Sequence, residues 1–192
     1  MIHRLVTELG VAPPEAPLVL LGMSNGGSMA SRVAQVPGLD AAAAMIYISN
    51  AQAFHEDGAK RPPMVLVPGA QDSGLAVTTN TDLADEIGDP DRALLIVNPP
   101  EPVADDLLAR ISGIDCDLSI AIKQDLIAGG FLDLDGTILQ DPKSDTEWLG
   151  LLPADAVAHQ LDIREVLLEA YAGHAPSSDQ NARVFDFVVS HL

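Results

Sequence analysis

A serine between glycines is the residue of this sequence best suited to carry out chemistry. Ser24 lies at the centre of Gly22-Met23-Ser24-Asn25-Gly26, a G-x-S-x-G pentapeptide. This pattern places a serine on a strained turn between a strand and a helix, where its hydroxyl projects above a sheet. The backbone N–H of Asn25 then faces a developing oxyanion at the helix N-terminus. The spacing therefore predicts a nucleophilic serine, with Asn25 as one oxyanion donor.

A carboxylate is expected after this serine in the chain. A hydroxyl is a weak nucleophile near neutral pH and needs a base, usually a histidine held by a carboxylate. With a nucleophile of this kind, the chain order is serine, acid, histidine. Asp72 follows an expected strand over 64–67, at the carboxyl end where such sheets carry their catalytic groups. We interpret Asp72 as the orienting acid, and the alternative is a solvated turn or a helix cap.

Five histidines compete for the role of the base. His174 follows Gly173 in a loop before the last expected helix, from which its ring is able to swing over the serine. His159 lies in an expected helix over 154–161 and is the main alternative. The other three lie in terminal helices or precede the acid: His3, His191 and His55. We therefore predict His174 as the base.

The elements that must position these residues follow an alternating pattern. Four apolar stretches predict buried strands, and segments with helical spacing follow the first and the third. This alternation indicates an α/β fold with a mostly parallel sheet and flanking helices. The expected strands cover 18–21, 42–49, 64–67 and 93–97, and the expected helices cover 2–9, 28–36 and 78–87.

The alternation stops near residue 101. The segments expected beyond it are helices over 103–111 and 118–128, a hairpin turn at Asp135-Gly136, a strand over 166–171 and a helix over 182–191. We therefore expect a catalytic core made of residues 1–98 and 166–192. Residues 99–165 are expected to form a helical and hairpin insertion, which is a candidate lid over the site.

Composition excludes several classes of protein. The formal net charge of −18 disfavours a nucleic-acid partner, because phosphate repels such a surface. No apolar stretch reaches the roughly 18–20 residues of a membrane span. Met1 is not followed by a basic segment and an apolar core, so we do not expect a signal peptide. Cys116 is the single cysteine, so we expect no internal disulfide and a reducing, cytoplasmic location. Four Phe, two Tyr and one Trp predict an aliphatic substrate pocket.

These motifs together resemble the catalytic half of an α/β hydrolase. They are GMSNGGSMA from Gly22, PMVLVPGAQD ending at Asp72, and Gly173-His174 before a C-terminal helix. The Ser-Asn-Gly-Gly core is similar to that of esterases related to polyhydroxyalkanoate depolymerases and feruloyl esterases. The resemblance covers residues 2–98 and 166–192. It implies Ser24 as nucleophile, Asp72 as acid, His174 as base and Asn25 as oxyanion donor.

The same resemblance implies a reaction class. It predicts acyl transfer from a small-molecule carboxylic ester, with no metal or organic cofactor. Thioesters and polyesters use the same machinery and are less favoured alternatives.

Two features depart from the family pattern. The family sheet has strands ahead of the serine strand, together with a loop that supplies a second oxyanion N–H. About 17 residues precede Leu18 here. We therefore expect that the chain is part of a longer protein, or that another chain or a second copy covers strand 18–21. In addition, about a hundred residues separate Asp72 from His174, roughly three times the family's usual spacing, as an insertion requires.

Two other interpretations stay open. The segment from Phe131 to Thr137, FLDLDGT, matches the phosphate-transfer motif of haloacid-dehalogenase-like phosphatases, with Asp133 as nucleophile and Asp135 as acid/base. That family needs a lysine and further acids well downstream, and Lys143 is the single lysine among the 55 residues after the motif. An Asp-Gly hairpin explains the same letters. The other interpretation is a non-catalytic α/β-hydrolase-like binding or scaffold protein.

Overall fold

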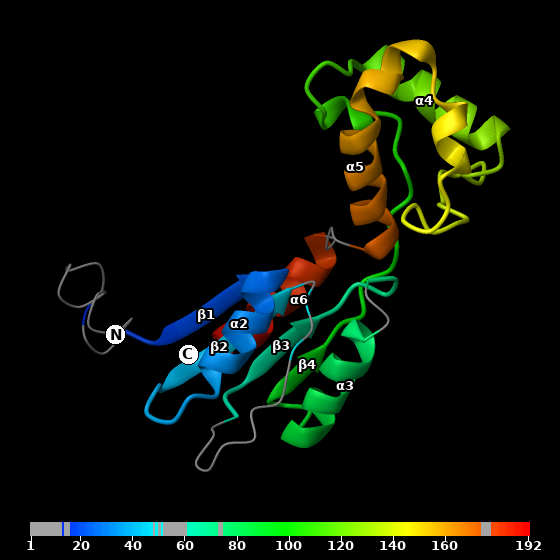
Figure 1. Cartoon of the computed structure of the whole chain (residues 1–192). Coiled ribbons are helices and arrows are strands. Elements are labelled where there is room, and N and C mark those ends of the chain that lie inside the picture. The colour runs from blue at the N-terminus through cyan, green and yellow to red at the C-terminus, as the bar shows by residue number, and fades with distance from the viewer. Residues whose placement is uncertain are drawn as a thin grey trace. The chain divides into compact units, whose positions relative to one another are not determined.

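The computed structural model describes residues 13, 16–47, 49, 51, 61–72, 75–173 and 178–192 (Figure 1). The chain divides into two compact units, which are described separately. Unit 1 comprises Met1–Pro68, Gly74–Val97 and Ser177–Leu192, and unit 2 comprises Gly69–Ser73 and Asn98–Pro176. The expected helix over 2–9 lies outside the described residues.

Unit 1 contains a four-stranded parallel sheet in the order β1-β2-β3-β4. The strands are β1 (Leu18–Met23), β2 (Ala41–Tyr47), β3 (Met64–Val67) and β4 (Ala93–Leu95). All four expected strands are confirmed, with end points that differ by up to two residues. Since the strands are parallel, their carboxyl ends meet at one edge of the sheet, where ligands bind in open α/β sheets.

Helices cover both faces of this sheet. The helices are α2 (Asn25–Ala34), α3 (Ala76–Ile87) and α6 (Ser178–Val189). Residues of α2 and α3 pack with Ile46 and Leu66 on one face. On the other face, Val184 and Val188 of α6 pack with Met45 and Val65. Burial on both faces explains why β2 and β3 are apolar without alternation. The α/β fold class is therefore confirmed.

Unit 2 is helical and has a core of its own. It contains α4 (Cys116–Ala128), α5 (Gln160–Ala172) and three 3-10 helices, η1 (Leu107–Arg110), η2 (Glu147–Leu151) and η3 (Ala154–His159). Trp148 is 1% exposed in this core, and its ring centroid lies 5.7 Å from that of Phe131. The helix expected over 118–128 is confirmed. The one expected over 103–111 is wrong, because that segment forms the single 3-10 turn η1.

The strand expected over 166–171 is also wrong, because this segment belongs to α5. Five residues of α5 are buried, and four of them, Ile163, Val166, Leu167 and Ala170, have a spacing that puts them on one face of a helix. The fifth is Ala172, at the end of the helix. The division of the chain therefore differs from the expected one, in which the catalytic core resumes at residue 166. Residues 166–176 join the segment from Asn98 onward in unit 2, instead of joining the sheet.

The turn around Asp135-Gly136 is a hairpin with a three-residue loop instead of the expected two. The Asp133 N–H donates to Thr137 O over 2.9 Å, and the Gly136 N–H donates to Asp133 O over 3.0 Å. Gly136 has φ of 92°, which fits a type I turn followed by a residue in the left-handed region. The segments on either side of the loop are joined by one isolated antiparallel bridge, between Leu132 and Ile138, and do not form a ladder of several pairs.

Candidate active site

Ser24 lies between β1 and α2 in a strained backbone conformation. Its φ is 53° and its ψ is −129°. Among the described residues it is the one non-glycine with a positive φ. Such a conformation costs about 1–3 kcal/mol and persists only where the surroundings fix it. The Ser24 N–H donates to Tyr47 O over 3.1 Å, and Ser24 O accepts the Gly27 N–H over 2.9 Å. Neighbouring backbone therefore holds the strained turn.

Two glycines allow the turn to close. A Cβ on Gly22 would overlap the carbonyl oxygen of Gly26, and one on Gly27 would lie 2.6 Å from the Ser49 Cβ. A Cβ on Gly26 itself would meet nothing within 4 Å. Backbone segments therefore pass close to each other at this turn, and the glycines that allow it are Gly22 and Gly27. Ser24 and Asn25 are both exposed, and Asn25 is the first residue of α2.

A buried polar contact holds the end of β2 against this turn. The hydroxyls of Ser28 and Ser49 lie 2.8 Å apart. Asn80 of α3 is fully buried, and its Nδ2 donates to Ser49 O over 2.7 Å. The first turn of α2 is therefore tied to α3 through Ser49. Nothing in the sequence alone points to Ser49 and Asn80, because contacts between residues distant in the chain leave no local pattern.

Asp72, the predicted acid, belongs to unit 2. It follows β3 by five residues and is half-buried. Its N–H donates to Gly69 O over 3.2 Å, which closes a turn over 69–72. Two residues before the acid, the Ala70 N–H donates to Asn98 O over 2.8 Å.

The predicted base, His174, lies outside the described residues, which resume at Ser178. The residue before it, Gly173, ends α5 with φ of 76°. Asn98 is 2% exposed, and its Nδ2 donates to Gly173 O. The structure thus brings together the turn that carries Asp72 and the residue that precedes His174, both in unit 2.

The alternative base, His159, is the last residue of η3 and is half-buried. A Cβ on Gly113 would lie 2.7 Å from its Cε1, so the ring packs against the Gly113 backbone. At the other end of the chain, the Nδ1 of His191 lies 2.8 Å from Phe187 O in α6. His3 and His55 lie outside the described residues.

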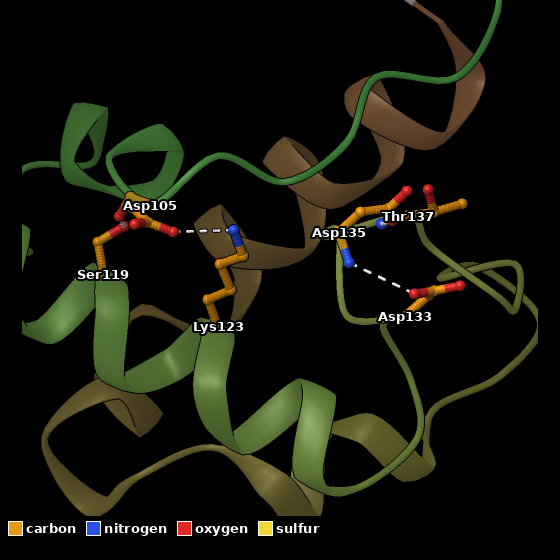
Figure 2. A network of polar contacts seen from close by, with 6 residues as sticks. All are labelled: Asp105, Ser119, Lys123, Asp133, Asp135 and Thr137. Atoms are coloured by element: carbon orange, nitrogen blue, oxygen red, sulfur yellow. Dashed lines mark hydrogen bonds and ion pairs between the residues drawn. The ribbon is translucent and has the colours of Figure 1, made fainter.

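The aspartates of the phosphatase-like motif serve the hairpin turn (Figure 2). The Asp135 N–H donates to Asp133 Oδ1 over 3.3 Å, and the Thr137 N–H donates to Asp135 Oδ1 over 2.9 Å. Hydrogen bonds from Thr137 hold the pKa of Asp135 below its ordinary value, which disfavours a role as proton donor. Lys123 pairs with Asp105 over 2.8 Å. The two aspartates of the motif therefore accept hydrogen bonds from the backbone of the hairpin turn, as the Asp-Gly hairpin interpretation predicts.

Comparison of the chain with protein-family models, curated proteins and solved structures finds no match. In the part of the chain that the structure describes, no helix is both long and apolar enough to cross a membrane. Within that same part, no cluster of three or more His, Cys, Asp or Glu side chains is placed to hold a metal ion.

Proposed function

We propose that the chain is a serine hydrolase that cleaves carboxylic esters through an acyl-enzyme on Ser24. One observation carries the proposal. Ser24 has a strained backbone of φ 53° and ψ −129° between a parallel strand and a helix, and its side chain is exposed. Backbone strain of this kind clusters at active sites, and a strand-to-helix turn is where the G-x-S-x-G pattern presents its nucleophile.

The proposed reaction is acyl transfer in two halves. Ser24 Oγ attacks the ester carbonyl carbon while His174 accepts the hydroxyl proton, and Asp72 orients the imidazole and stabilises its charged form. The N–H of Asn25 binds the oxyanion. Collapse breaks the ester C–O bond, and His174 returns the proton to the leaving alcohol. Water then repeats these steps on the acyl-enzyme and releases the acid and free Ser24.

Two further observations support the acid and the base. Asp72 follows the carboxyl end of β3 by five residues, as expected for the catalytic acid of an α/β-hydrolase fold. The Asp72 turn and Gly173 both contact Asn98, so the chain approaches the acid one residue before His174. We accordingly propose the α/β-hydrolase fold for this chain, with a small-molecule ester as substrate. Thioesters and polyesters remain the alternative substrates.

A fluorophosphonate probe tests the nucleophile. We expect one label per folded chain on Ser24, and no label on Ser24→Ala. Hydrolysis of p-nitrophenyl butyrate should fall by on the order of 10⁶-fold in Ser24→Ala. Ser112→Ala is the matched control, because Ser112 is an exposed serine outside the turn, and it should keep both labelling and turnover.

The result also separates the two function classes. A correctly folded chain that is neither labelled nor hydrolytic would contradict the hydrolase and favour a non-catalytic binding or scaffold protein. Full turnover in His174→Ala together with lost turnover in His159→Ala would move the base to His159.

A further inference from the structure

Asn98 connects two segments of unit 2 that are far apart in the chain. It forms a parallel bridge with Gly69, and its carbonyl oxygen accepts the Ala70 N–H over 2.8 Å. Its side-chain Nδ2 donates to Gly173 O, across 75 positions of sequence. The backbone of Asn98 therefore binds the turn that contains Asp72, while its side chain binds the residue that precedes His174.

The segments around Asn98 are packed without space between their backbones. A Cβ on Gly69 would overlap the carbonyl oxygen of Ala172. A Cβ on Gly173 would lie 2.8 Å from Pro99 O and closer still to Asn98 O. Gly173 also has φ of 76°, a conformation that a residue with a Cβ rarely adopts. The acid turn, Asn98 and the end of α5 therefore form one tight backbone junction, which we call the Asn98 clasp.

The side chain of Asn98 is the polar group that links the two ends of this junction. Asn98 is 2% exposed, so water does not readily replace its hydrogen bond to Gly173 O. Loss of the amide would leave a buried carbonyl oxygen without this donor, which destabilises the junction. The clasp also joins the two ends of the segment 99–172, so the chain leaves at Pro99 and returns beside its point of departure at Gly173.

We propose that Asn98 is a positioning residue for the acid and the base, an inference that rests on the proposed function. Asn98 holds Gly173, the residue that precedes His174 in the chain, against the turn that carries Asp72. It acts through these neighbours and does not touch the substrate. Because a displacement of about 1 Å in catalytic geometry can cost on the order of 10²-fold in rate, loss of the clasp lowers kcat more than it changes KM.

A double-mutant cycle with the acid tests this role. We expect Asn98→Ala to lower kcat for p-nitrophenyl butyrate by about 10–100-fold, with KM changed less than about threefold. In an Asp72→Ala background, the same substitution should lower kcat by less than about threefold, because Asn98 sets the position of the base relative to the acid and that pairing is already lost. An equal loss in both backgrounds would overturn the proposal, since a general loss of folded protein lowers both alike.

Ser119→Ala is the matched control. Ser119 is 1% exposed in α4 of the same unit, and its Oγ donates to Asp105 O over 2.7 Å. This variant therefore also loses one buried hydrogen bond to a backbone oxygen, and its kcat should stay within about twofold of the unmodified chain. Asn98→Asp is the second variant in case Asn98→Ala fails to fold. It keeps the side-chain volume and replaces the Nδ2 donor by an acceptor, so the same non-additive loss is expected.

Hydrogen exchange separates failure of the clasp from failure of the proposed function. In Asn98→Ala, amides of 69–72 and 172–173 should exchange at least about tenfold faster than in Ser119→Ala, whether or not the chain hydrolyses esters. Unchanged exchange in these segments would overturn the clasp. If exchange is faster in Asn98→Ala but turnover of the unmodified chain does not depend on Ser24, the clasp stands. That result would overturn the proposed function and, with it, the role of Asn98 in positioning an acid and a base.

Discussion

The backbone of Ser24 is strained, and contacts with other residues of unit 1 hold it in this conformation. At φ of 53° and ψ of −129°, the Cβ is crowded by backbone in a way that a glycine would avoid. The hydrogen bond from the Ser24 N–H to Tyr47 O and the close approach of Gly22 to Gly26 fix the turn from both sides. The serine is therefore held where its hydroxyl is exposed, at the expense of stability.

This cost can be measured with two substitutions at the same position. Ser24→Gly relieves the strain and Ser24→Ala retains it, while both remove the hydroxyl. Strain of about 1–3 kcal/mol, less about 0.5–1 kcal/mol for the greater freedom of glycine in the unfolded chain, predicts that Ser24→Gly is more stable by about 1 kcal/mol, and by at most about 2.5 kcal/mol. Urea unfolding of the two variants gives the difference.

The control for this measurement is the same pair of substitutions at Ser112, whose φ is not positive. There the alanine variant should be the more stable of the two. An alanine variant that is also the more stable at Ser24 would show that the turn stores no strain.

At the scale of elements, Tyr47 joins three parts of unit 1. Its carbonyl oxygen accepts the Ser24 N–H at the end of β2. Its hydroxyl donates to Asn181 Oδ1 of α6 over 3.3 Å. Burial raises the pKa of Tyr47 above its ordinary value of 10.0, because a buried phenolate is poorly solvated. β2, which supports the Ser24 turn, is therefore also hydrogen-bonded to α6, on the face of the sheet opposite to α2 and α3.

The raised pKa predicts a dependence of stability on pH. In the unfolded chain Tyr47 loses its proton near pH 10, and in the folded chain it does so at a higher pH. Its contribution to stability is therefore intact below about pH 10 and is lost as the pH rises from there through the folded pKa. Urea unfolding from pH 7 to 11 should show a shallower alkaline decline for Tyr47→Phe than for the unmodified chain.

The same variant should be less stable by about 0.5–1.5 kcal/mol at pH 7, through loss of the hydrogen bond. Tyr171→Phe, at the half-buried tyrosine of α5, is the comparison. Identical alkaline declines in Tyr47→Phe and the unmodified chain would contradict the assignment.

At the scale of the whole molecule, the chain carries a formal charge of −18, yet β1 exposes two apolar side chains, Leu21 and Met23. Leu21 and Met23 pair with Met45 and Tyr47 in register, so they lie on the face that α6 covers, yet they are 66% and 58% exposed. β1 is an edge strand of the sheet and carries no charged residue. Edge strands usually carry charges or proline that prevent pairing. This supports the sequence-based expectation that another chain or a second copy covers β1.

Sedimentation velocity tests the second copy as the cover of β1. Because two chains of like charge repel, we expect the chain to dimerise more strongly as salt screens the repulsion. Leu21→Glu should return it to a monomer, whereas Leu161→Glu should not, since Leu161 is 73% exposed in α5 of unit 2. A monomer at every salt concentration would exclude a second copy and leave a different chain, or a further part of a longer protein, as the cover of β1.

The sequence by itself determined the features that depend on neighbours in the chain. Runs of apolar residues predicted the four parallel strands, because strands buried on both faces cannot alternate. The glycines around Ser24 predicted a strand-to-helix turn, and the place of Asp72 after β3 made it the candidate acid. Tertiary structure decided what depends on distant partners. The Asn98 amide meets Gly173 across 75 positions, and Asn80 meets Ser49 across 31, and such hydrogen bonds leave no periodic pattern. The short apolar stretch from Val166 also fits a strand as well as a buried helix when only the sequence is considered. Its packing with other residues of unit 2 made it the helix that leads to Gly173.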